Sequence, residues 1–334
     1  PPAVPFSDRP VDAMRPLAAA LILLAWQAPA HGPAIRGPML GYVFDPGAAA
    51  IRPILGIPGA ATLGAPLDLG EPIVRAVISP RQDFALAVAA SDSRVLAVSL
   101  PSGTAEGCEC APGPDRILFS PRGDAAALYY SAGARLRVLP RAGTARGGEF
   151  DLSLFPGELT ALAVSDSGAA LAAFLNESAG IVYYLESGRE PGLALSLSRA
   201  SALAFLPASS DALATDDVDD RLYLIRDPGG RAEVTLTAAA GDGLEKPAAV
   251  LGLEKSRALT ADARGIVMTD LTAGFSSVIE CGFAPGDLQP LGGSVYRLAA
   301  PSPGPLWFLD GGAPGARVFF VPPDNFAPPQ EEQP

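Results

Sequence analysis

Residues 119–125 read Phe-Ser-Pro-Arg-Gly-Asp-Ala, and a short apolar segment ending at Tyr130 follows them. Variants of this heptapeptide, each also followed by an apolar segment, occur at 78–84 and 164–170. Proline and glycine after an apolar residue, with another apolar run beyond them, are typical of a hairpin between two strands. The chain therefore contains a repeated hairpin, and internal repeats are the strongest guide to its fold.

The repeat extends over most of the chain. Three further units begin near Phe205, Leu251 and Tyr296, so the spacing between units is about 41 to 47 residues. Each unit holds four short runs rich in Val, Ile, Leu, Tyr and Phe, bounded by Gly, Pro, Asp and Ser. Four-stranded units with this period predict an all-β propeller, in which each blade is one antiparallel meander packed against its neighbours. Tandem β-sandwiches are the alternative, although they would show seven or more strands in each domain and no such regular unit.

The hairpin at 119–125 resembles the Phe-Ser-Pro-Asp-Gly hairpin of WD-like and TolB-like β-propellers. The resemblance covers nearly all of residues 39–322 and implies the architecture alone, because the Gly-His and Trp-Asp pairs of true WD repeats are missing. Six four-stranded blades are expected, with seven as the alternative. Residues 40–44 and 51–57 add a turn between two strand-like segments. These could close the ring against the last blade or be the remnant of a seventh blade.

The region before the repeats predicts export. Met14 and Arg15 precede an apolar run over 17–26, and Ala28-Pro29-Ala30 forms a small-x-small cleavage site. We expect an upstream extension at 1–13, a signal peptide at 14–30, a propeller at 31–322 and a disordered tail at 323–334. A core helix is the alternative for the apolar run. The expected location is therefore the bacterial periplasm or the extracellular space, with no membrane span in the mature chain.

Composition restricts the partners. The net charge of −12 disfavours nucleic acid and anionic membranes, which need a clustered basic surface. His31 is the only histidine and lies at the expected cleavage site, so catalysis or zinc binding by histidine is disfavoured. A monomer that binds an unknown protein, peptide or glycan is expected.

The cysteines are Cys108, Cys110 and Cys281, and each of the two segments that hold them ends in a similar Pro-Gly tail. The sequence places them near the ends of innermost strands, facing the central channel. In an exported protein one disulfide plus one thiol, or small buried thiols, are the expected states. A three-thiolate metal or redox site is the alternative.

An acidic run contains Asp216, Asp217, Asp219 and Asp220. It aligns with the turns at 91–93, 132–133 and 262–264, which are expected to join third and fourth strands, so a solvated hairpin is the first interpretation. A calcium site is the second, because calcium takes oxygen ligands; otherwise no cofactor is expected.

Two functions follow from these patterns. The first is a non-enzymatic binding or scaffold propeller of the cell envelope, which fits regular blades without a catalytic constellation. The second is a calcium-dependent lactonase or esterase, in which Asp216, Asp217 or Asp287 would hold the metal in the channel. The second function requires carboxylates from several blades to converge on the axis.

Overall fold

The turn chemistry of the repeated heptapeptide explains why the chain folds into consecutive hairpins. In the computed structural model, the backbone N–H of Ala125 donates to the Ser120 hydroxyl oxygen at 3.0 Å, and that of Ala169 donates to the Ser165 hydroxyl oxygen at 2.9 Å. Both serines are buried. The hydrogen bond therefore closes the turn and also gives the buried hydroxyl oxygen a partner. The structure describes residues 37–141, 147–177, 179–254, 256–299, 304–312 and 315–322.

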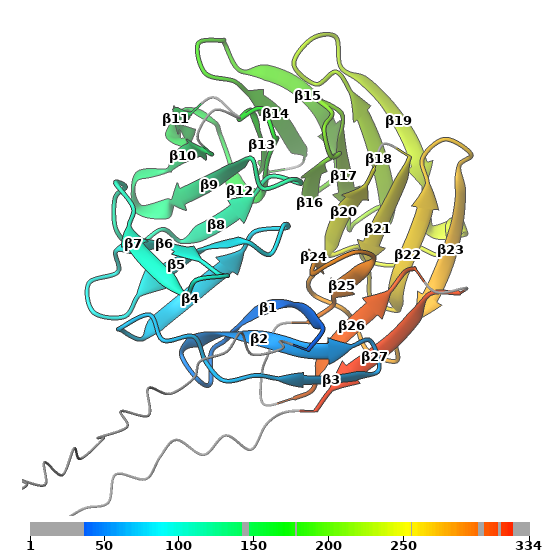
Figure 1. Ribbon diagram of the computed structural model, residues 1–334. Helices are drawn as coiled ribbons and strands as arrows, with labels where there is room; N and C mark the ends of the chain where they lie inside the picture. The colour runs from blue at the N-terminus through cyan, green and yellow to red at the C-terminus, as the bar shows by residue number, and fades with distance from the viewer. Residues whose placement is uncertain are drawn as a thin grey trace, which may run out of the picture. The chain divides into compact units, whose positions relative to one another are not determined.

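These residues form seven antiparallel sheets arranged as the blades of a propeller, shown in Figure 1 from blue blade 1 to red blade 7. Blade 1 contains β1 (Met39–Asp45), β2 (Ala50–Ile57) and β3 (Ala60–Leu63). Blade 2 contains β4 (Ile73–Ile78), β5 (Phe84–Ala89), β6 (Val95–Ser99) and β7 (Thr104–Gly107). Blade 3 contains β8 (Arg116–Phe119), β9 (Ala125–Tyr130), β10 (Arg135–Pro140) and β11 (Gly148–Asp151). Blade 4 contains β12 (Glu158–Val164), β13 (Ala170–Leu175), β14 (Gly180–Leu185) and β15 (Gly192–Leu197).

Blade 5 contains β16 (Ala200–Phe205), β17 (Ala212–Asp216), β18 (Arg221–Arg226) and β19 (Glu233–Ala238). Blade 6 contains β20 (Ala249–Leu253), β21 (Arg257–Ala261), β22 (Gly265–Asp270) and β23 (Phe275–Glu280). Blade 7 contains β24 (Gln289–Pro290), β25 (Val295–Arg297), β26 (Leu306–Asp310) and β27 (Arg317–Val321). The helices in the described part of the chain are 3₁₀ turns, at Ser131–Gly133, Leu152–Leu154 and Ala240–Asp242. Within the same residues no helix has the length and apolar content needed to cross a bilayer.

The predicted all-β propeller is confirmed, and its ring has seven blades, the alternative, rather than six. The segments at 40–44 and 51–57 form β1 and β2 of a separate blade and do not pair with the last one. Among the described residues that blade has three strands rather than the expected four. Its third strand, Ala60–Leu63, is short and weakly apolar, which is why the sequence did not reveal this blade.

A separate apolar cluster fills each of the seven interfaces between neighbouring blades. The cluster that closes the ring contains Val43 and Ile54 of blade 1 with Phe308 and Val321 of blade 7. The ring therefore closes by side-chain packing, the interaction that also joins the other blades.

Gln82 adds a polar tie at the closure. Its side-chain oxygen accepts from the backbone N–H of Tyr42 in blade 1 at 2.6 Å, and its amide donates to the carbonyl oxygen of Pro290 in blade 7 at 2.9 Å. Gln82 itself lies in the first hairpin of blade 2 with a φ of 59°, a region that favours glycine. The corresponding residue of blade 3 is Gly123, with a φ of 68°. One side chain thus links three blades from a strained backbone position.

Candidate functional site

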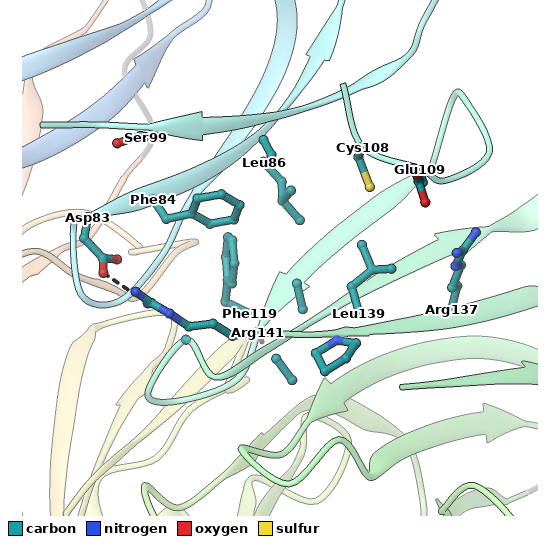
Figure 2. Close-up of a pocket in the computed structure, with 15 residues that line it drawn as sticks. Asp83, Phe84, Leu86, Ser99, Cys108, Glu109, Phe119, Arg137, Leu139 and Arg141 are labelled. Carbon is teal, nitrogen blue, oxygen red and sulfur yellow. Dashed lines mark hydrogen bonds and ion pairs between the residues drawn. The ribbon is translucent and has the colours of Figure 1, made fainter. Parts of the chain in front are cut away.

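A pocket of about 570 Å³ opens between blades 2 and 3, and we call it the interblade pocket (Figure 2). Its volume falls in the range of small-molecule sites, roughly 300 to 1,000 Å³. It is lined by residues of β5, β6, β8, β9 and β10, by the turns beside them, and by Cys108 and Glu109 after β7.

Strand alternation explains why the floor is apolar. Successive side chains of a strand point to opposite faces, so Phe84 and Leu86 of β5 face blade 3, and Leu139 of β10 faces blade 2. Phe119 of β8 completes the floor, and its ring meets that of Phe84 edge to face at 6.1 Å between centroids. The pocket is therefore an extension of the core cluster between these two blades.

One position of β6 that lines the pocket carries a small residue. Ala97 pairs with Leu86 in blade 2. In blades 3, 4 and 5 the residue that takes the place of Ala97 is larger: Val138 pairs with Ala127, Tyr184 with Leu171, and Leu224 with Leu213. Each of these larger residues is buried against the next blade. Ala97 is therefore the smallest residue at this position in blades 2 to 5, and the third strand of blade 2 fills less of the space that faces the next blade.

Charged side chains form the rim. Asp83 accepts from the Arg141 guanidinium at 3.1 Å and from the Ser79 hydroxyl at 3.0 Å, and the former contact is the dashed line in Figure 2. Burial opposes ionisation of Asp83, but these hydrogen bonds outweigh it and lower the pKa of the carboxyl group. Asp83 therefore stays ionised and neutralises Arg141.

A second cation lines the pocket without such a partner. Arg137 lies two residues before Leu139 on the same face of β10, and its side chain is half-buried. Within the described residues, no carboxylate lies within ion-pair distance of its guanidinium. The exposed Glu109 lines the opposite wall and is not bonded to Arg137 in Figure 2. The pocket thus combines an apolar floor with a half-buried guanidinium that forms no ion pair with the described residues.

The cysteines occupy equivalent places, but not the predicted ones. Cys108 follows β7 and Cys281 follows β23, which are the outermost strands of blades 2 and 6, so the prediction of innermost strands facing the channel is wrong. All three thiols are free in the structure, and the two segments belong to different blades, so the three do not form one thiolate site. Cys108 lines the interblade pocket. Burial and the neighbouring Cys108 raise the pKa of the Cys110 thiol to about 12, and burial raises that of Cys281 to about 11.

The acidic run forms the hairpin between β17 and β18, the second and third strands of blade 5. Asp216 is fully buried, and its oxygens accept from the backbone N–H groups of Ser198 at 2.8 Å and Val218 at 3.0 Å. Asp262 makes the same kind of contacts in blade 6, to Glu245 at 3.1 Å and Arg264 at 2.8 Å. This repetition identifies a turn device that two blades share.

The other three carboxylates point to different partners. Asp217 pairs with Arg199, Asp219 accepts from the Ser198 hydroxyl at 2.8 Å, and Asp220 accepts from the Lys246 N–H at 2.6 Å. Among the described residues, no group of three or more acidic, cysteine or histidine side chains is placed to hold a metal ion. The predicted calcium ligands are therefore not brought together around one point.

The central channel contains a second cavity, of about 210 Å³. Blades 2 to 7 each contribute a residue from the first strand, namely Ile78, Phe119, Val164, Phe205, Leu251 and Pro290. Asp287 is the one charged residue among the described residues lining it, and it is paired with the buried Arg297. Asp216 and Asp217 do not line this cavity, so the convergence of carboxylates that the hydrolase interpretation requires is not seen.

The predicted signal peptide at 14–30 and the predicted tail at 323–334 lie outside the described residues. Sequence reasoning also missed the interblade pocket altogether. Its one sequence signal is the contrast between Ala97 and the larger residues at the equivalent positions. That signal becomes visible only when the third strands are aligned through their pairing with the second strands.

No protein-family model and no curated protein matches the sequence. Among solved structures, the chain is similar to a functionally unknown protein from Desulfotomaculum acetoxidans, with 11% identity and a TM-score of 0.56 over 85% of this chain and 100% of that one. It is also similar to hydrazine synthase from Kuenenia stuttgartiensis, with 11% identity and a TM-score of 0.52 over 89% of this chain and 99% of that one. At such identities the likeness concerns the fold alone. The chain is thus a seven-bladed β-propeller, and its activity has to be argued from its own site.

Proposed function

We propose that this protein is an exported, non-enzymatic binding propeller of the cell envelope, and that the interblade pocket holds its ligand. The observation that carries the proposal is the pocket itself, about 570 Å³ with an apolar floor and a charged rim. Concave sites of this size, mostly apolar with a few polar groups, are the usual form of ligand-binding sites. Among protein, peptide and glycan partners, the apolar floor favours one that inserts an apolar group.

The contrast at position 97 supplies a selective test. Ala97→Leu places in blade 2 the residue that blade 5 already carries at the equivalent position, so the blade is expected to fold while the pocket narrows. The probe is N-phenyl-1-naphthylamine, a neutral apolar dye that fluoresces when it leaves water. Saturable fluorescence with the wild-type chain, weakened at least tenfold in Ala97→Leu at an unchanged unfolding temperature, is expected. Equal dye binding by both proteins would overturn the pocket as the ligand site.

Export is tested separately. The chain with residues 14–30 should be recovered, shortened, from the periplasmic fraction of a bacterial host, and a chain that lacks them should stay in the cytoplasm. Recovery of both chains from the cytoplasm, with the first of them uncleaved, would refute the export part of the proposal.

A further inference from the structure

We infer that the interblade pocket selects an apolar carboxylate, a ligand whose hydrocarbon body rests on the floor while its carboxylate meets Arg137. This inference rests on the proposed function and adds the chemical class of the ligand. Both halves of the ligand are read from residues that the fold places side by side.

The negative charge of the ligand is inferred from Arg137, the half-buried charged side chain of the lining that forms no ion pair with the described residues. Asp83 and Arg141 are already bonded to each other at 3.1 Å, so this pair presents no net charge to a ligand. Glu109 on the opposite wall is exposed, so water screens its charge more than that of a half-buried group. Arg137 has no ionic partner among the described residues, and it lines the pocket from the half-buried middle of β10. A half-buried guanidinium is stabilised by an anion, and its planar fork matches the two oxygens of a carboxylate.

The body of the ligand follows from the surfaces beside that guanidinium. Arg137 and Leu139 lie on one face of β10, so a carboxylate at the first is followed directly by apolar surface at the second. The rings of Phe84 and Phe119 form the rest of the floor and suit an aromatic or branched aliphatic group. The small Ala97 and Ser99 leave the space that this group would fill.

A free aromatic acid and the C-terminal residue of a peptide both offer this chemistry. The experiment therefore measures displacement of N-phenyl-1-naphthylamine in two arms. The first compares 1-naphthaleneacetate with the neutral 1-naphthaleneacetamide. The second compares a short peptide ending in phenylalanine with a free C-terminus against the same peptide amidated. The acid should displace the dye at a concentration at least tenfold below that of its neutral partner, because a hydrogen bond to a charged group contributes that much. The arm with the larger ratio identifies the source.

Arg137→Gln should abolish the discrimination while the dye still binds. The matched control is Arg135→Gln, which removes the same charge from the same strand at a residue that pairs with Glu149 at 3.1 Å and does not line the pocket. This control should retain the discrimination. Equal potency of acid and neutral partner in both arms, or discrimination that persists in Arg137→Gln, would overturn the inference. Failure of the dye to bind the wild-type chain would instead overturn the proposed function.

Discussion

Replacing Gln82 by glycine changes two opposing contributions to the free energy of unfolding at the point where the ring closes. Glycine relieves a φ of 59°, which costs a residue with a side chain about 1 kcal/mol. It also removes the acceptor for the N–H of Tyr42 and the donor to the carbonyl of Pro290. Tyr42 is buried, so its N–H would lose its partner without access to water, at about 1 to 3 kcal/mol, and the bond to Pro290 adds about 1 kcal/mol.

The losses exceed the relief, so we expect Gln82→Gly to destabilise the propeller by about 1 to 3 kcal/mol. Thermal unfolding followed by circular dichroism should show the melting temperature lowered by roughly 2 to 12 °C, at about 2 to 4 °C per kcal/mol. Ala208→Gly is the control, because Ala208 also has a positive φ, of 52°, and its side chain forms no hydrogen bond. This control should melt at an equal or higher temperature. If Gln82→Gly raised the melting temperature as well, Gln82 would not be a tie between blades.

Three further predictions concern the titratable groups. The lowered pKa of Asp83 stabilises the folded chain above the ordinary value of 3.8, and this stabilisation is lost as the pH falls below it. Asp83→Asn should therefore reduce the fall of the melting temperature at acid pH. An unchanged fall would exclude the pair of Asp83 and Arg141 as a source of the acid sensitivity. At pH 8 a thiol with a pKa of about 12 is ionised in roughly one molecule in 10⁴. Iodoacetamide should therefore leave Cys110 and Cys281 unlabelled in the folded chain. After unfolding it should label three cysteines, whereas a chain with a disulfide would have one cysteine to label. Asp216→Asn should lower the free energy of unfolding by about 2 to 3 kcal/mol, because it removes a charged acceptor from backbone N–H groups. Excess calcium chloride should leave the wild-type melting temperature unchanged, and a rise would support the calcium interpretation instead.

The sequence predicted the repeating unit and the propeller because alternation, turn residues and period are local properties. It did not predict where each blade begins, since a periodic pattern can be divided into four-strand units at any of four phases. The hairpin of residues 119–125 joins first and second strands, and the phase adopted from sequence was shifted from the observed one. That shift explains two errors together: Cys108 was assigned to an inner strand, and the turn after Asp216 was assigned to third and fourth strands.

The candidate site was beyond reach for a different reason. A pocket is a volume, and the volume beside Leu86 depends on its cross-strand partner Ala97 and on Phe119 of the next blade. None of these residues is unusual in its own segment. The carboxylates that were singled out are conspicuous in sequence, yet Asp216 is consumed by its own turn. The cluster of carboxylates in the sequence therefore indicated a hairpin. The pocket could not be predicted in the same way, because it depends on how side chains of two blades pack against each other.

The propeller has a separate apolar core at each of its seven interfaces between blades. Each interface is filled independently, so a recess can be opened or closed at one of them while its neighbours keep their packing. Tyr184 occupies in blade 4 the place that Ala97 occupies in blade 2. Truncating it would carve a second recess, lined by different neighbours, into a ring that remains closed. A family of such chains could therefore acquire new ligands by shortening one side chain at a time, without altering a single loop.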